Sequence, residues 1–226
     1  MKICGVEDAG RGSMIGPMVI AGISIEKKNI PKLRKLGVRD SKKISPKKRE
    51  LLYKEIVKLV DDYHIIRIPP RTIDKYVFEH NLNHLEAKKM ADVISKLNPD
   101  LSYVDSCDVN ATRFGREISD LSNKSKVKSY HYADSRFVVV SAASILAKVS
   151  RDRSIMRLNK TAIVGSGYPS DKKSVNYVKK LVSSRKSLPT SVRKSWKPVQ
   201  KILGLIKRSS NNHCMIFIKR FQINSL

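Results

Sequence analysis

Residues 6–12 read Val6-Glu7-Asp8-Ala9-Gly10-Arg11-Gly12: two acids close a short apolar strand, and a glycine turn follows them at once. Ionised carboxylates at the edge of a core are costly unless a cation or a hydrogen-bond donor neutralises them. Where several acids converge, a hard divalent metal ion is the usual neutralising partner. The glycine turn would let a nucleic-acid backbone approach closely. The stretch therefore predicts a metal-dependent enzyme that acts on nucleic acid.

The net charge of the chain supports a polyanionic partner. Its 226 residues, enough for one well-buried domain with an appended subdomain, carry 46 lysines and arginines against 20 acids, a formal charge of +26. Such an excess favours binding to nucleic acid or to an anionic membrane. Asp171 is the last acid, and the 55 residues after it hold 14 lysines and arginines. We expect this region to grip a nucleic-acid duplex; the alternative is a solvated basic surface.

Other features argue against a membrane protein, a secreted protein and a thiolate metal site. The longest apolar run, residues 14–25, is interrupted by glycine and proline and is too short to cross a bilayer. Acids stand at positions 7 and 8, where a signal peptide needs its apolar region, so we expect a cytoplasmic protein without a membrane partner. The three cysteines lie far apart without a Cys-x-x-Cys pair, which favours reduced thiols over structural zinc or a disulfide framework.

Hydrophobic periodicity and turn residues predict an α/β fold with a mixed sheet. The expected strands are residues 2–7, 17–25, 63–68, 101–104 and 127–133, and the first two should form an antiparallel pair. One helix is expected to begin at Ser45-Pro46. Further helices are expected over residues 83–97, 138–149, 171–183 and about 190–207.

Four acids follow apolar segments that are predicted as strands: Glu7, Asp8, Asp105 and Asp134. Acids at strand ends gather at one edge of an open α/β sheet. Four carboxylates there suit two divalent metals about 3.5–4 Å apart, as in two-metal phosphoryl hydrolysis. The alternative for each acid is a role in a solvated turn, where aspartate is common.

Motifs along residues 2–197 resemble those of the ribonuclease HII family, the type 2 ribonucleases H. The opening signature is Glu7-Asp8-Ala9-Gly10-Arg11-Gly12 followed by Ile15-Gly16-Pro17-Met18-Val19-Ile20-Ala21. The resemblance continues through Asp40-Ser41-Lys42-Lys43, Tyr103-Val104-Asp105-Ser106-Cys107-Asp108, Ala133-Asp134-Ser135, the run 140–149 with Arg151-Asp152, Gly165-Ser166-Gly167-Tyr168-Pro169-Ser170-Asp171 and Ser195-Trp196.

The resemblance implies an endonuclease that cuts RNA in RNA–DNA hybrids and cuts 5′ of ribonucleotides embedded in duplex DNA. The products carry a 3′-hydroxyl and a 5′-phosphate, and the enzyme uses Mg²⁺ or Mn²⁺ and serves ribonucleotide removal in DNA repair and replication. We expect a ribonuclease H-like catalytic domain over residues 1–165 and, from the basic composition of the C-terminal stretch, a basic helical subdomain over 166–208. The tail, 209–226, has no assigned role, and we expect a monomer.

The resemblance assigns a role to individual residues as well. It implies that Glu7, Asp8, Asp105 and Asp134 are the catalytic metal ligands. The backbone of Gly10, Arg11 and Gly12 would meet the 2′-hydroxyl of the ribonucleotide and its phosphates, and Tyr168 would support that hydroxyl. Lys42 and Lys148 are candidate phosphate contacts, with a solvated lysine as the alternative for each. The side chain of Arg11 could also form a salt bridge to Asp8 or to a neighbouring acid.

Three points stay open at this level. A non-catalytic basic nucleic-acid-binding protein would explain the charge, although it would not explain four acids at strand ends. The related ribonuclease HIII carries an N-terminal binding domain, which we do not expect here because the chain starts at its first catalytic strand. The family normally shows Asp before Glu, whereas Glu7 precedes Asp8 here. Either the backbone compensates for the changed reach of the two side chains, or the rate and the metal preference shift.

Overall fold

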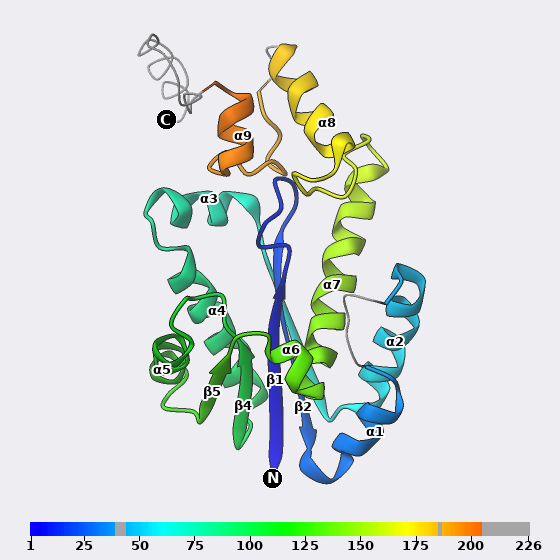
Figure 1. Ribbon diagram of the computed structural model, residues 1–226, viewed down its shortest axis with the longest axis vertical. Helices are drawn as coiled ribbons and strands as arrows, with labels where there is room; N and C mark the ends of the chain where they lie inside the picture. Colours follow the sequence, from blue (N-terminus) through cyan, green and yellow to red (C-terminus); the bar gives the residue numbers. More distant parts are fainter. Residues whose placement is uncertain (39–43, 185–186, 205–226) are drawn as a thin grey trace.

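Five strands form one mixed sheet in the order β3-β2-β1-β4-β5 (Figure 1). The structure, a computed structural model, describes residues 1–38, 44–184 and 187–204. The strands are β1 (Lys2–Ala9), β2 (Met18–Glu26), β3 (Asp62–Ile68), β4 (Leu101–Asp105) and β5 (Val127–Tyr130). Strand β1 is antiparallel to β2 and parallel to β4. The predicted α/β fold and the antiparallel pairing of the first two strands are confirmed.

Helices cover both faces of the sheet (Figure 1). One face carries α1 (Ile30–Lys35), α2 (Pro46–Leu59) and α7 (Val138–Asn159). The other carries α3 (Pro70–Phe78), α4 (Leu82–Leu97) and α5 (Ala111–Leu121). A short 3-10 helix (Lys27–Asn29) follows β2, and α6 (Ala133–Arg136) follows β5. The predicted start at Ser45-Pro46 is confirmed, because the Ser45 hydroxyl accepts a hydrogen bond from the Lys48 N–H at 3.4 Å.

Side chains along β1 alternate between the two faces of the sheet, as in any strand. Ile3 packs into the core under α7, whereas its neighbour Cys4 packs into the core under α4. The same alternation sends the side chain of Glu7 toward the α7 face and that of Asp8 toward the α4 face. Two acids that are adjacent in sequence thus leave the strand in opposite directions.

Helix α7 lies directly against β1 because residue 5 is glycine. A Cβ atom added to Gly5 would lie 2.3 Å from the carbonyl carbon of Val139, so no other residue allows this approach. The helix continues to Asn159, beyond the predicted end at residue 149. The prediction stopped where the apolar run stops, yet the last turns are helical with mostly polar side chains.

Two other predicted elements are wrong in extent. The strand predicted over residues 127–133 ends at Tyr130, because Tyr132 takes a left-handed conformation (φ 56°) that turns the chain into α6. The helix predicted over about 190–207 is limited, within the described residues, to α9 (Lys197–Ile202). Residue 192 instead forms an isolated bridge to Ile15.

A third core joins the C-terminal elements to the glycine turn. Helices α8 (Lys172–Ser183) and α9 lie together beyond the end of the β1–β2 pair (Figure 1). The residues that share this core come from the turn, the end of α7 and the C-terminal segment: Met14, Ile15, Ile155, Val164, Val178, Val192 and Val199. Helix α8 confirms the predicted basic helix over 171–183. The proposed division at residue 165 stays a prediction, and the tail over 209–226 lies outside the described residues.

Candidate active site

Three carboxylates converge at one edge of the sheet. Glu7 comes from β1, Asp105 from the last position of β4, and Asp134 from the first turn of α6. One ligand oxygen from each lies within 4.8 Å of the other two. The parallel pairing of β1 and β4 places Glu7 and Asp105 beside each other at the same end of the sheet. We call these three residues the carboxylate cluster.

Asp134 reaches the cluster from a helix, not from the end of a strand. The turn before it is fixed by the carboxylate of Asp105, which accepts a hydrogen bond from the N–H of Ala133 at 2.5 Å. The hydroxyl of Ser141, in α7, donates to the carbonyl oxygen of Asp134. The predicted position of Asp134 at a strand end is therefore wrong, although its predicted closeness to Glu7 and Asp105 is confirmed.

Asp8 lies on the other side of β1 and is not a member of the cluster of three. The pKa of Asp8 is raised to about 7, chiefly by burial and then by the carboxylate of Glu86, while Arg11 opposes the rise. The carboxylate of Asp105 also raises the pKa of Asp8. Asp8 therefore stands at the margin of the cluster, between it and helix α4.

The electrostatics of the cluster favour a bound cation. Burial raises the pKa of Glu7 well above its usual range, the neighbouring acids Asp8, Asp105 and Asp134 raise it further, and Lys148 opposes them. The Oε2 atom of Glu7 is buried without a hydrogen-bond partner among the described residues. An all-oxygen donor set with an orphaned buried carboxylate oxygen fits a hard divalent metal.

The glycine turn, residues 10–16, follows β1 directly. Gly10 (φ 82°) and Gly16 (φ 87°) both take left-handed conformations that favour glycine. The N–H of Ser13 donates to the carbonyl oxygen of Gly10 at 3.2 Å, which closes a tight turn. Within the described residues, the N–H groups of Gly10, Arg11 and Gly12 donate to no other backbone group.

The side chain of Arg11 holds the turn to helix α4. Its Nε lies 3.0 Å from both carboxylate oxygens of Glu86, and its Nη2 donates to Asn83 Oδ1 at 2.8 Å. Asn83 in turn donates to Asp108 at 2.9 Å. The sequence leaves Asp8 or another nearby acid as the salt-bridge partner of Arg11. The second alternative is confirmed, because the partner is Glu86.

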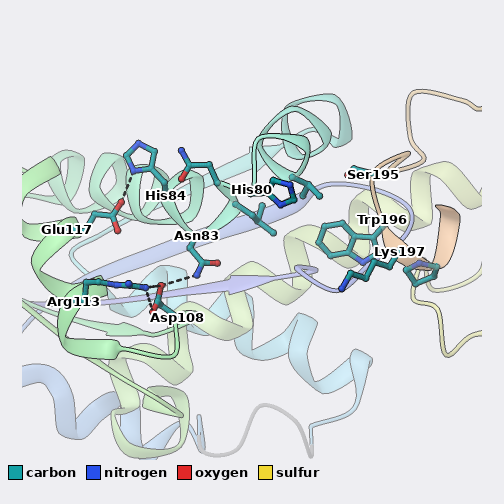
Figure 2. A pocket seen from close by; sticks show the side chains of 13 residues that line it. His80, Asn83, His84, Asp108, Arg113, Glu117, Ser195, Trp196 and Lys197 are labelled. Atoms are coloured by element: carbon teal, nitrogen blue, oxygen red, sulfur yellow. Dashed lines mark hydrogen bonds and ion pairs between the residues drawn. The ribbon is translucent and has the colours of Figure 1, made fainter. Parts of the chain in front are cut away.

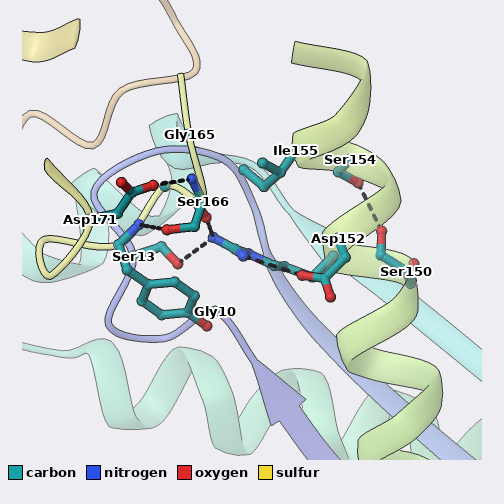
Figure 3. Close-up of polar contacts among 12 residues, drawn as sticks. Gly10, Ser13, Ser150, Asp152, Ser154, Ile155, Gly165, Ser166 and Asp171 are labelled. Atoms are coloured by element: carbon teal, nitrogen blue, oxygen red, sulfur yellow. Dashed lines mark hydrogen bonds and ion pairs between the residues drawn. The ribbon is translucent and has the colours of Figure 1, made fainter. Parts of the chain in front are cut away.

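Tyr168 stands beside the same turn, held by a buried arginine of α7. The guanidinium of Arg151 lies over the Tyr168 ring, 4.4 Å from its centre. It also donates to Ser13 Oγ at 3.0 Å and to Asp152 Oδ1 at 3.3 Å (Figure 3). The ring is thus fixed next to the glycine turn, where the resemblance expected it.

Of the two lysines predicted to contact phosphate, the structure describes the position of one, Lys148. Lys148 lies on α7, half-buried, close enough to Glu7 to oppose the rise in the pKa of that acid. It is therefore at the site, on the side of the cluster that α7 forms. Lys42 lies outside the described residues.

A groove of about 760 Å³ opens beside the turn (Figure 2). Trp196 and Lys197 line one wall, and Asn83, Asp108 and Arg113 line the other. Arg113 is ion-paired to Asp108 at 2.7 Å, and its side chain stays two-thirds exposed. An aromatic ring among basic side chains is typical of surfaces that contact a nucleic-acid strand.

Three residues of this arrangement were not foreseen from the sequence: Asn83, Glu86 and Arg193, whose guanidinium donates to carbonyl oxygens of the glycine turn. Glu86 had a signal, because it is an acid on the apolar stripe of α4, four residues before the buried Met90. No sequence pattern distinguishes Arg193, since it is one of many basic residues in the C-terminal segment.

A mixed sheet with carboxylates converging at one edge, beside a glycine turn, is the arrangement typical of metal-dependent phosphodiester hydrolases. Comparisons with known proteins make this more specific. The family model described as Ribonuclease HII matches residues 4–199. The chain therefore belongs to the ribonuclease HII family, and it is an endoribonuclease of the ribonuclease H type.

Individual relatives agree over most of their length. Ribonuclease HII of Cenarchaeum symbiosum is 54% identical over 202 residues, which cover 89% of this chain and 98% of that protein. Ribonuclease HII of Thermococcus sibiricus is 43% identical over 225 residues, 97% of this chain and 100% of that protein. The crystal structure of ribonuclease H2 from Pyrococcus horikoshii superimposes with a TM-score of 0.84 at 40% identity, covering 91% of this chain and 98% of that one.

Proposed function

We propose that the enzyme hydrolyses RNA in RNA–DNA hybrids and cuts 5′ of ribonucleotides embedded in duplex DNA. The products would carry a 3′-hydroxyl and a 5′-phosphate. The observation that carries the proposal is the carboxylate cluster, whose ligand oxygens lie within 4.8 Å of one another beside the glycine turn. A basic nucleic-acid-binding protein without activity would have no use for buried acids held this close, because each raises the cost of ionising the others.

Glu7, Asp105 and Asp134 would hold Mg²⁺ or Mn²⁺, with Asp8 contributing from the margin of the cluster. Two such ions, when bound, activate water and stabilise the leaving oxygen of an in-line displacement. The chain's own contribution is to fix the ligands: Asp105 is held by the N–H of Ala133, and Asp134 by the hydroxyl of Ser141. Lys148 lies on the α7 side and would balance part of the negative charge.

Recognition of the ribonucleotide falls to the glycine turn and to Tyr168. The 2′-hydroxyl distinguishes RNA from DNA at a single position. The N–H groups of Gly10, Arg11 and Gly12 make no hydrogen bond to the backbone of the described residues, so they can donate to that hydroxyl and to the phosphates around it. Tyr168, held by Arg151, would pack against the sugar on the 3′ side.

Affinity for the duplex would come mostly from basic residues around the cleft, in a salt-dependent manner. Lys148, Arg113 and the C-terminal helices α8 and α9 are the candidates around the cleft, and Lys42, outside the described residues, is a candidate from the sequence motif alone. Residues 166–208 would form the duplex-binding subdomain. We propose a monomer that acts on nucleic acid in the cytoplasm. No helix of the described residues is long and apolar enough to cross a membrane.

The proposal is tested with a DNA duplex that contains one ribonucleotide, incubated with Mg²⁺ or Mn²⁺, with the cut position mapped at nucleotide resolution. We expect a single cut 5′ of the ribonucleotide by the wild-type protein. Binding without any cut, with either metal, would instead favour the non-catalytic alternative.

The assignment of the ligands is tested with Asp134→Asn, which removes one carboxylate charge from the cluster. We expect loss of cleavage with unchanged binding to an RNA–DNA hybrid. Asp120→Asn is the matched control, because Asp120 is an exposed acid ion-paired only to Lys124 among the described residues. Full activity of Asp134→Asn would show that the ligand assignment is wrong.

A further inference from the structure

The guanidinium of Arg193 is buried behind the glycine turn. Its side chain is fully buried, and it donates three hydrogen bonds to backbone carbonyl oxygens of the turn. Nη2 bonds the oxygen of Gly10 at 2.7 Å, Nη1 that of Arg11 at 2.8 Å, and Nε that of Gly16 at 3.1 Å. The N–H of Arg193 itself donates to the oxygen of Met14 at 2.8 Å. One side chain therefore satisfies three acceptors on a single loop.

No described carboxylate oxygen lies within 4.0 Å of this guanidinium. A buried cation without a direct ion pair is unfavourable. Its hydrogen-bond partners here are neutral carbonyl groups, and the acids Asp74 and Asp8 favour the charged form only from farther away. Burial lowers the pKa of Arg193 only to about 10, so the side chain is charged at neutral pH. What the position requires is the fixed planar fork of donors that arginine alone among side chains provides.

Trp196 extends the same set of contacts. Its indole Nε1 donates to the carbonyl oxygen of Gly12 at 3.2 Å, and Arg193 lies 5.2 Å from the centre of its ring. The carbonyl oxygens of residues 10, 11 and 12 are thus all bound by one short C-terminal segment. This segment is itself anchored by Asp74, which accepts hydrogen bonds from the N–H groups of Lys194 and Ser195 at 3.0 and 2.9 Å.

Fixing a carbonyl oxygen also fixes the next N–H group, because the two belong to one planar trans peptide and point in opposite directions. The bond from Arg193 to the oxygen of Gly10 orients the N–H of Arg11. Its bond to the oxygen of Arg11 orients the N–H of Gly12. These are N–H groups without a backbone acceptor in the described structure.

We propose that Arg193 is a positioning residue for ribonucleotide recognition: it holds the peptide planes of residues 10–12 so that their N–H groups meet the 2′-hydroxyl. The inference rests on the proposed function of the glycine turn. It gives the C-terminal segment a second task besides duplex binding, since the discrimination between ribonucleotide and deoxyribonucleotide depends on it.

Arg193→Lys tests the proposal, because lysine keeps the charge but cannot reach three carbonyl oxygens with a planar fork. A misplacement of about 1 Å at a reacting group costs roughly 100-fold in rate. We therefore expect kcat/KM on the single-ribonucleotide duplex to fall about 100-fold. Arg153→Lys is the matched control, because Arg153 of α7 makes two hydrogen bonds to Glu50 of α2 and none to the glycine turn among the described residues. It should stay within about twofold of wild type, a change that corresponds to well under 1 kcal/mol.

Two readouts separate positioning from a general loss of structure or of duplex binding. Affinity for an all-DNA duplex should be unchanged, while the preference for the ribonucleotide-containing duplex over it should be lost. Amide hydrogen exchange should become faster in residues 10–16 and stay as in wild type in α4. Activity of Arg193→Lys within threefold of wild type, or equal loss of affinity for both duplexes, would overturn the proposal.

Trp196→Phe serves as a second variant in case Arg193→Lys does not fold. It removes one hydrogen bond to Gly12 and keeps an aromatic ring, so a smaller loss of the same preference is expected, and an unchanged preference would count against the proposal. Failure of the proposed function looks different: wild-type protein would then leave the single-ribonucleotide duplex uncut. The effect of Arg193→Lys on hydrogen exchange in residues 10–16 would still report whether it orders the turn.

Discussion

The carboxylate cluster and the glycine turn both bury charge, and they neutralise it in opposite ways. Glu7 is buried beside other acids, with one carboxylate oxygen that has no hydrogen-bond partner among the described residues. Arg193 is equally buried, yet the carbonyl groups of the turn satisfy its guanidinium within the protein. The cluster therefore needs a cation from solution, whereas the turn is complete as the chain folds.

This difference separates two kinds of functional residue. Residues that bind a ligand directly carry unfavourable interactions in its absence, and replacing them relieves those interactions. Residues that support the ligand-binding groups are already fully bonded, so replacing them leaves partners unsatisfied. Mutations in the two regions should consequently change stability in opposite directions, even though both reduce activity.

The largest effect is expected for Arg193→Met. The substitution leaves the carbonyl oxygens of Arg11 and Gly16 without a described donor in a buried place, and leaves that of Gly10 with the N–H of Ser13 alone. Since each unsatisfied buried group costs about 1–3 kcal/mol, and loss of the buried charge offsets part of this, the free energy of unfolding should fall by about 3 kcal/mol. Urea denaturation measures it, with Arg153→Met as the control, whose loss of a half-exposed ion pair should cost less than about 1 kcal/mol. A loss no larger than that of the control would remove the contrast between the two regions.

The next effect is stabilisation of the wild-type protein by divalent metal. Binding to the folded state alone, at 100 times the dissociation constant, stabilises by about 2.7 kcal/mol. Thermal unfolding with Mg²⁺ or Mn²⁺ and with a chelator should show this difference. In Asp134→Asn the difference should be smaller, because one ligand charge is missing, and in Arg193→Lys it should be unchanged. A metal effect that is equal in wild type and in Asp134→Asn would place the ion elsewhere.

Glu7→Gln is expected to change the free energy of unfolding by less than Arg193→Met does, and in the opposite direction. In a chelator, replacing a carboxylate whose ionised form is disfavoured by burial and by neighbouring acids should raise the free energy of unfolding by about 1 kcal/mol, while cleavage is lost. Thermal unfolding without metal tests the expected gain in stability, and the cleavage assay tests the expected loss of activity. Glu55→Gln, which removes an exposed acid paired with Lys58, is the control and should leave both nearly unchanged. Destabilisation by Glu7→Gln would mean that the protein itself satisfies this carboxylate.

The smallest effect is expected when the usual order of the two acids is restored with Glu7→Asp and Asp8→Glu together. The charge of the site is unchanged, and each side chain changes its reach by one methylene. Positions that hold a reacting group tolerate errors of about half an ångström. We expect a change in rate or in the preference between Mg²⁺ and Mn²⁺, measured on the single-ribonucleotide duplex, and the same cut position. A different product would contradict the assignment of both positions.

Much of the sheet could be predicted because local signals and tertiary packing agree there. Strand β2 is nearly all buried and apolar, and Ser45-Pro46 provides both a cap and a first helical residue. Where the local sequence signal and the tertiary packing favour different structures, the prediction is wrong. Residues 127–133 alternate like a strand, but the left-handed turn at Tyr132 is imposed by what surrounds it, including the bond from Ala133 to Asp105.

The candidate site was predictable to a similar degree, and for a similar reason. Glu7 and Asp105 end neighbouring strands, so their closeness follows from sheet topology. Arg193 meets the turn across 183 positions of sequence, and no local pattern marks that contact. For Asp8, closeness in sequence is a poor guide to the position of the side chain. Asp8 is adjacent to Glu7, which suggested one shared site, but side chains alternate along β1 and the two acids therefore point to opposite faces of the sheet.

The contact between Arg193 and Gly10 also sets an order of events during synthesis. The ribosome makes the glycine turn among the first residues, and it makes its main hydrogen-bond donor 183 positions later. A nascent chain that still lacks residue 193 contains the residues of all five strands and of most helices. Of the carbonyl oxygens of residues 10–12, only that of Gly10 then has a donor seen in the described structure, the N–H of Ser13. Under the role proposed for Arg193, the turn is translated among the first residues and gains the donor that orients its N–H groups only after residue 193 is made, so a chain that ends before it should not select a ribonucleotide.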